Sequence, residues 1–161
     1  HMMVANVRGE FGAFEGSLTV HGDAPPTAQL AVTIDATTVD TREPKRDEHL
    51  RSADFFDTAS HPKITFTSKR VERAGAGLKV TGDLTMRGVT KEVVLDVTEL
   101  TPPIQDPWGG TRVGAHATTK VNRKEFGLAW SKALETGGLV VADEVNVILD
   151  VELVHRPAAA K

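Results

Sequence analysis

Two histidines and three aspartates lie close together in the stretch RDEHLRSADFFDTASHPKITF, residues 46–66. The five residues are Asp47, His49, Asp54, Asp57 and His61. Imidazole and carboxylate groups at short separations could hold a zinc ion or act as an acid–base pair. Their spacing matches no standard metal motif such as H-E-x-x-H. The structural alternative is that Asp47 caps a short helix over residues 49–53, while Asp54 and Asp57 cap turns around two phenylalanines.

Other kinds of catalytic site find little support in the sequence. Ser68 lies in a predicted strand, outside any G-x-S-x-G elbow. The chain contains no cysteine, which excludes disulfides, thiol catalysis and cysteine–zinc sites. We therefore expect no catalytic residue, no metal and no cofactor, and a protein that is not an enzyme. An enzyme that uses His49 or His61 as a base remains an alternative.

Three arginines are candidates for recognising an anionic group. Arg46 and Arg51 flank the predicted helix, and Arg123 follows a predicted strand. Guanidinium groups could donate charge-assisted hydrogen bonds to a phosphate or another lipid head group. In the alternative, which the sequence favours, they pair with nearby carboxylates and hold the corner together: Asp47, Asp54 and Glu125.

Alternation of apolar and polar residues dominates the rest of the chain. It is clear over residues 30–36, 78–86, 93–97, 113–121 and 145–153, and weaker over 7–20 and 64–71. A period of two predicts strands with one apolar and one solvated face. Turn signals such as AGAG (74–77), RGVT (87–90) and TPPIQDPWGG (101–110) separate the runs. The pattern predicts an all-β antiparallel sandwich or barrel of about seven strands, with a short capping helix near residues 47–54.

The composition fits one domain over residues 1–161 that binds neither nucleic acid nor a membrane interior. The net charge is −3, and charges of both signs are interspersed. No apolar run approaches the roughly 18 residues of a membrane span. Small residues on the apolar faces would leave room for one ligand inside a barrel, and aliphatic walls would suit a hydrocarbon. These residues are Ala36, Gly82, Ala115 and Ala117.

Several long motifs resemble those of the YceI-like family, in order along residues 7–153. They are GEFGAFEGSL, TREPKRDEHLRSADFFD, HPKITFTS, VTGDLTMRGVTKEVVLDV and NRKEFGL. The resemblance implies a lipocalin-like antiparallel barrel that binds polyisoprenoids or other long amphiphilic lipids in an elongated pocket. It implies no catalytic activity.

The same resemblance raises a question about the first strand. Family members begin with one further strand before the segment HMMVANVRG, so we expect this chain to lack it. A barrel without that strand would have an unpaired edge, and self-association as a homodimer would cover it. The sequence contains no signal peptide, so we expect a cytoplasmic protein, or a periplasmic or secreted one if a longer N-terminus exists.

We therefore predict a protein that carries or stores a long-chain amphiphilic lipid, of which a polyisoprenoid is the favoured class. The lipid is the expected partner, with head-group contacts from Arg46, Arg51 and Arg123. The alternatives are the enzyme described above, with the barrel as an apolar substrate tunnel, and a structural barrel that binds nothing. The predicted apolar pocket consists of Phe11, Phe14, Leu30, Val32, Ile34, Leu50, Phe55, Phe56, Phe66, Val80, Gly82, Leu84, Ala115, Ala117, Phe126, Trp130, Val147 and Leu149.

Overall fold

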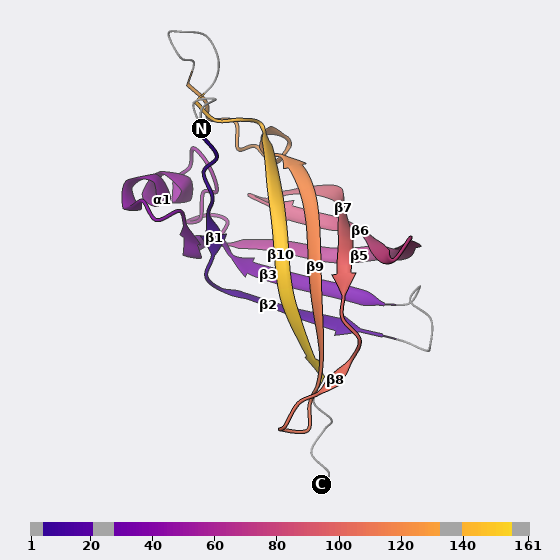
Figure 1. Cartoon of the computed structure of the whole chain (residues 1–161). Helices are drawn as coiled ribbons and strands as arrows, with labels where there is room; N and C mark the ends of the chain where they lie inside the picture. The colour runs from indigo at the N-terminus through magenta and orange to yellow at the C-terminus, as the bar shows by residue number, and fades with distance from the viewer. Residues whose placement is uncertain (1–4, 21–27, 133–139, 156–161) are drawn as a thin grey trace.

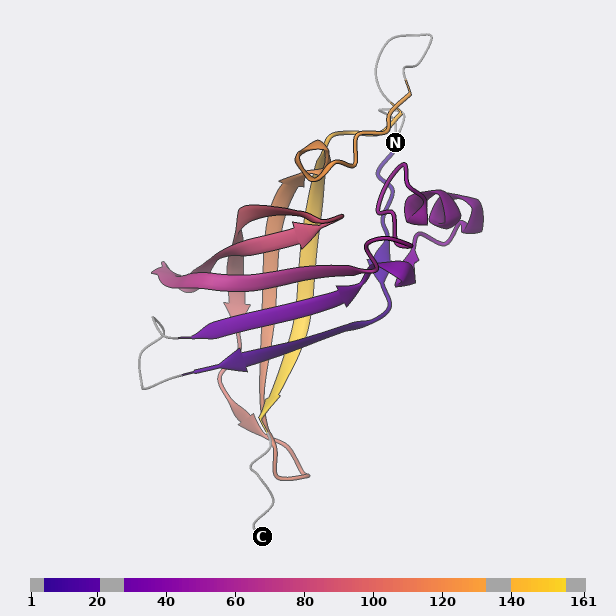
Figure 2. The same cartoon turned by 180° about the vertical axis from the view of Figure 1, so that it is seen from behind.

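A computed structural model describes residues 5–20, 28–132 and 140–155, which form antiparallel strands and one α-helix. Figures 1 and 2 show the strands curling into a half-barrel, with the helix outside one end. In chain order the elements are β1 (Glu10–Phe11), β2 (Phe14–Thr19), β3 (Gln29–Asp35), η2 (Ala36–Thr38), β4 (Val39–Asp40), α1 (Pro44–Arg51), β5 (Lys63–Ala74), β6 (Gly77–Met86), β7 (Val89–Leu100), β8 (Ile104–Gln105), β9 (Thr111–Asn122), η3 (Arg123–Phe126) and β10 (Glu144–His155).

The main sheet has the order β10-β9-β7-β6-β5-β3-β2, and β8 pairs with β9 beside it. β1 and β4 form a separate two-stranded sheet. The predicted antiparallel lipocalin-like fold is confirmed as a half-barrel whose margins are β2 and β10. Within the described ranges, neither margin strand has a second partner in the main sheet. The expected missing first strand concerns the chain around residues 1–4 and before, outside the described residues, so it stays a prediction.

The alternating segments predict the main strands well. The five clear segments fall in β3, β6, β7, β9 and β10, and residues 64–71 fall in β5. The weak segment 7–20 is divided between β1 and β2. The RGVT turn is confirmed: Arg87 and Gly88 have positive φ angles of 51° and 73°, which favour a tight hairpin between β6 and β7. The short strands β4 and β8 were not predicted, because two residues are too few to show a period.

The predicted capping helix is confirmed, but its bounds and its cap differ. α1 begins at Pro44, whose fixed φ suits the first turn of a helix. The side chain of Glu43 accepts a hydrogen bond from the Arg46 N–H at 2.6 Å and caps the helix. Asp47 lies inside α1, so its predicted role as the cap was wrong. Among the described residues, no helix is long and apolar enough to cross a membrane.

Candidate functional site

The cluster of histidines and aspartates folds as a structural corner. Asp47 is buried, and its carboxylate accepts hydrogen bonds from the backbone N–H and the hydroxyl of Thr41. These bonds, above all that from the hydroxyl, lower the pKa of Asp47 below its usual 3.8, and nearby arginines add to the effect. Among the described residues, no group of three histidines or acids could hold a metal ion.

The two histidines have separate surroundings. The Nε2 of His49 lies 2.8 Å from a carboxylate oxygen of Asp54 at a partly exposed position. The ring of His61 packs against the β6–β7 turn, where it would contact a Cβ on Gly88. In addition, the N–H of His61 donates to the carbonyl of Asp57 at 2.8 Å. The carboxylate of Asp54 thus contacts His49, and Asp57 joins the turn through its backbone carbonyl, so the expected side-chain caps stay a prediction. The two histidines do not meet at one reaction centre.

The predicted head-group arginines bind backbone carbonyl groups. Arg46 donates to the hydroxyl and the carbonyl of Thr41 at 2.7 and 2.9 Å. Arg51 donates to the carbonyls of Thr37 and Val39 at 2.7 and 2.8 Å. Neither has an ion pair with a carboxylate among the described residues. Both arginines therefore attach α1 to the chain that follows β3, a role different from head-group binding and from the expected ion pairs.

Arg123 is more deeply buried and has more partners. Only 3% of its surface is exposed. Its guanidinium donates to the carbonyls of Leu128, Trp130 and Ala142, the last two at 2.7 and 2.8 Å. A longer contact of 3.4 Å joins it to the carboxylate of Asp143, not to Glu125. It thus holds together two segments that follow η3 and leaves no guanidinium face for a ligand.

Aromatic rings fill the end of the half-barrel nearest α1. The ring of His49 makes edge-on contacts with Phe55 and Trp130, with centroids 5.0 and 4.8 Å apart. Phe11 and Phe56 form a second edge-on pair at 5.6 Å. Phe55 is almost fully buried in this cluster. This end is therefore closed by packed side chains.

The inner face of the half-barrel carries two apolar clusters. One, near α1, contains buried Phe55, Ile64, Met86 and Phe126. The other, farther along the sheet, contains buried Phe66, Val71, Val80 and Leu95. Leu84 and Val93 pack against both, so the apolar surface is continuous along the face. The predicted pocket residues found in these clusters are Phe11, Leu30, Val32, Ile34, Leu50, Phe55, Phe56, Phe66, Val80, Leu84, Phe126, Trp130, Val147 and Leu149.

The other four predicted pocket residues have different positions. Phe14 pairs with Ile34 and shares its face, but 60% of its surface is exposed because β2 is a sheet margin. Ala117 is buried and Ala115 partly buried, on the face of β9 that carries Val121. Gly82 does not leave space for a ligand. A Cβ at this position would lie 2.5 Å from the Phe66 ring, so this ring fills the room over the glycine.

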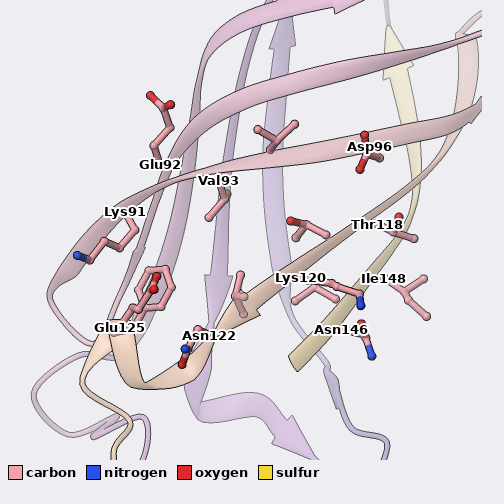
Figure 3. A pocket seen from close by; sticks show the side chains of 15 residues that line it. Lys91, Glu92, Val93, Asp96, Thr118, Lys120, Asn122, Glu125, Asn146 and Ile148 are labelled. Carbon is pink, nitrogen blue, oxygen red and sulfur yellow. The ribbon is translucent and has the colours of Figure 1, made fainter. Parts of the chain in front are cut away.

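A pocket of about 660 Å³ lies where β7 and β9 separate (Figure 3). The register between these strands ends at the pair Asp96–Thr118. Beyond it, within the described ranges, residues 89–95 of β7 pair with β6 alone, and residues 119–122 of β9 pair with β10 alone. Instead of continuing the ladder, the chain turns into η3 after Asn122, and η3 packs against β7.

Two residues that line this pocket, Phe126 and Val147, were predicted as pocket residues, and the sequence analysis did not assign the other lining residues to a pocket. Val93, Val121, Phe126 and Val147 line it and also belong to the cluster near α1. Polar and charged residues of the same strands surround them: Lys91, Glu92, Asp96, Thr118, Thr119, Lys120, Asn122, Glu125 and Asn146. Alternation marks which residues face inward, but it carries no signal for the place where two strands part.

The chain is similar to known proteins in both sequence and structure. The sequence profile of a family described as "YceI-like domain" matches residues 1–153. Protein YceI of Shigella flexneri is 40% identical over 156 residues, which are 97% of this chain and 78% of that protein. The crystal structure of a Campylobacter jejuni YCEI protein is 30% identical, with a TM-score of 0.82, covering 98% of this chain and 90% of the other.

A more distant structure shares the fold. It is a polyisoprenoid binding domain from Saccharophagus degradans implicated in plant cell wall breakdown, 16% identical to this chain. Its TM-score is 0.62, and the match covers 92% of this chain and 85% of that domain. At 16% identity, the similarity shows a shared fold and no more.

Proposed function

This chain belongs to the YceI-like family, and on that premise we propose that the inner face of its half-barrel binds the hydrocarbon tail of an amphiphilic lipid. A polyisoprenoid is the favoured class, and carriage or storage is the favoured role. The observation that supports the proposal best is the continuity of the apolar inner face, because Leu84 and Val93 join both clusters.

Burial of a tail on this face supplies enough free energy for binding. Each buried CH₂ contributes up to about 0.8 kcal/mol. A chain with about fifteen buried carbons therefore gains on the order of 12 kcal/mol before the costs of association and chain ordering. Micromolar affinity corresponds to about 8 kcal/mol, so it is within reach with few polar contacts.

Recognition in this proposal depends on the tail more than on the head group. Arg46, Arg51 and Arg123, the expected head-group ligands, donate to backbone carbonyls. Arg123 directs its guanidinium N–H groups to five acceptors of the protein itself, and Arg46 and Arg51 each use two donors to hold α1 in place. We therefore expect affinity to increase with the length of the lipid tail. A neutral prenol should bind as well as its charged counterpart.

Mass spectrometry and fluorescence titration test this proposal together. Organic extracts of the purified protein are examined for a lipid, and retinol, a fluorescent neutral isoprenoid alcohol, is titrated into the delipidated protein. Prenols of increasing length then compete with retinol. We expect saturable binding and stronger competition by longer prenols. If neither retinol nor any prenol binds, the inner face is a filled core and the proposal is wrong.

A further inference from the structure

We propose that the opening between β7 and β9 is a lateral passage through which the lipid tail reaches the inner face of the half-barrel. This inference rests on the proposed lipid-binding function and adds a route to it. Three observations support it: the lining residues come from both faces of the sheet, the helix end is closed, and the outer rim of the pocket is partly apolar.

The first observation is that the pocket crosses the wall of the half-barrel. Side chains alternate between the two faces of a strand. On β7, Val93 belongs to the inner cluster, whereas its neighbours Glu92 and Val94 point to the other face, and all three line the pocket. The same holds on β9 for Val121 and Lys120. A single pocket that contacts both faces connects the outside of the sheet with its apolar interior.

Packing of η3 accompanies the separation of the strands. Phe126 of η3 is only 1% exposed and packs in the same cluster as Val89 and Val93 of β7. In this region η3, which carries this ring, packs against β7. Within the described part of the chain, residues 89–95 of β7 and 119–122 of β9 do not pair with each other across the opening. Figure 3 shows the two strands parting from Asp96 and Thr118 toward Lys91 and Asn122.

Passage from the end near α1 is less favourable. That end is occupied by Phe55, Trp130 and His49, whose rings contact one another. Arg51 also attaches the helix to the carbonyls of Thr37 and Val39. A tail entering there would have to displace buried rings and break these hydrogen bonds.

The margin at β2 offers less enclosure than the β7–β9 opening. All six residues of β2 are exposed, so a tail lying there would remain largely in water. At the β7–β9 opening, by contrast, Val94 and Ile148 are exposed apolar side chains beside the pocket, 39% and 63% exposed. They provide apolar contacts on the outer side, before the tail reaches Val93, Val121 and Val147.

The charges on the rim favour a neutral head group. Lys91 and Lys120 contribute two positive charges, while Glu92, Asp96 and Glu125 contribute three negative charges, so the sum is −1. Lys120 is also paired with Glu144 at 2.9 Å. An uncharged amphiphile therefore meets less repulsion at this opening than one with a diphosphate.

A cysteine pair across the opening tests the route. Because the chain contains no cysteine, Val94→Cys/Lys120→Cys introduces one pair without competing thiols. The two positions face each other if the β7–β9 register is continued past Asp96 and Thr118. Oxidation, or a short bismaleimide linker if the disulfide does not form, closes the opening. The matched control, His116→Cys/Asp150→Cys, joins paired residues of β9 and β10 outside the pocket.

The readout is the rate and the final amplitude of retinol binding in stopped-flow fluorescence. We expect the cross-linked pair to bind retinol about tenfold more slowly or slower still, with an unchanged final amplitude. Reduction of the disulfide should restore the rate, and the control pair should bind at the parent rate in both states.

Each contrary outcome has its own meaning. An unchanged rate in the cross-linked protein overturns the lateral route and leaves the proposed function standing. A lost amplitude at an unchanged rate also overturns it, because the opening would then be part of the bound site. If the parent protein itself fails to bind retinol or any prenol, the proposed function fails, and the route fails with it.

Discussion

The guanidinium group of Arg123 lies 2.7 Å from the carbonyl oxygen of Trp130 and donates a second hydrogen bond from the same nitrogen to the carbonyl of Leu128. With its further bond to Ala142, this one side chain satisfies the backbone of two segments that follow η3. A buried carbonyl that loses its donor costs about 1–3 kcal/mol.

Replacement of Arg123 should therefore destabilise the protein severely. We expect Arg123→Met to lower the free energy of unfolding by about 3 kcal/mol or more, because several buried acceptors lose their donor. Urea denaturation followed by circular dichroism measures the change. Arg70→Met is the control: that side chain is 61% exposed and pairs with Glu72, which is also exposed, so its loss should have little effect. Equal effects of the two substitutions would contradict the role given to Arg123.

The two adjacent phenylalanines of the corner should differ in their contribution to stability. Phe55 is 6% exposed, whereas Phe56 is only partly buried. Truncation of a fully buried ring to alanine costs about 3–5 kcal/mol. We expect Phe55→Ala to reach that range and Phe56→Ala to cost less, in the same urea assay. A larger loss in Phe56→Ala would show that the aromatic cluster packs differently in solution.

His116 should make stability depend on pH. Its Nδ1 lies 2.6 Å from Asp150, and Glu99 is its register partner on β7. The hydrogen bond to Asp150, with smaller effects of charge, raises the pKa of His116 above 6.5. The charged form is thus favoured in the folded state, so the stabilisation is complete below pH 6.5 and is lost as the pH rises through the raised pKa.

The measurement compares the parent with His116→Gln across the pH range. We expect the parent to be more stable at about pH 5.5 and the two proteins to converge by about pH 8.5. A stability difference that stays constant with pH would mean that the imidazole contributes through packing and not through its charge.

A bulky residue on the inner face should block the lipid. Ala117 is buried between Val97 and Leu149 in the sheet register. We expect Ala117→Phe to remove the binding of long prenols, at a stability cost of about 1–3 kcal/mol from overpacking. His116→Phe, the next residue on the same strand and on the opposite face, is the matched control and should bind prenols normally at pH 8. Retained binding in folded Ala117→Phe would place the tail elsewhere.

Alternation was sufficient to predict most of the sheet, because a curled sheet with one apolar face imposes a period of two on every strand. It also placed residues such as Leu84 and Phe66 on the inner face. It was not sufficient for Gly82, because the room over a glycine depends on which neighbouring ring leans across it, here Phe66. A contact of this kind, between a ring on one strand and a glycine on the next, depends on the strand register and on the ring's rotamer. Neither can be predicted from the sequence of one strand.

The arginines show a second limit of sequence reasoning. Head groups and carboxylates were natural partners to consider, because both are chemically distinctive. Arg46, Arg51 and Arg123 instead bind carbonyl oxygens, which every residue carries. Because every residue has a backbone carbonyl, residue types alone do not indicate which carbonyl an arginine will bind. The β7–β9 opening was missed because alternation does not mark where two strands stop pairing, here beyond Asp96 and Thr118.

The strand order of the main sheet has a consequence for how the chain folds. Among the described residues, the strands of the main sheet follow one another across it in the order of the chain, from β2 and β3 to β9 and β10. The turns that join β5 to β6 and β6 to β7 are short, and short loops cost little entropy to close. During synthesis, β2, β3, β5 and β6 can pair before the later strands emerge. β10, which follows them in the chain, then adds to β9 at the margin of the sheet.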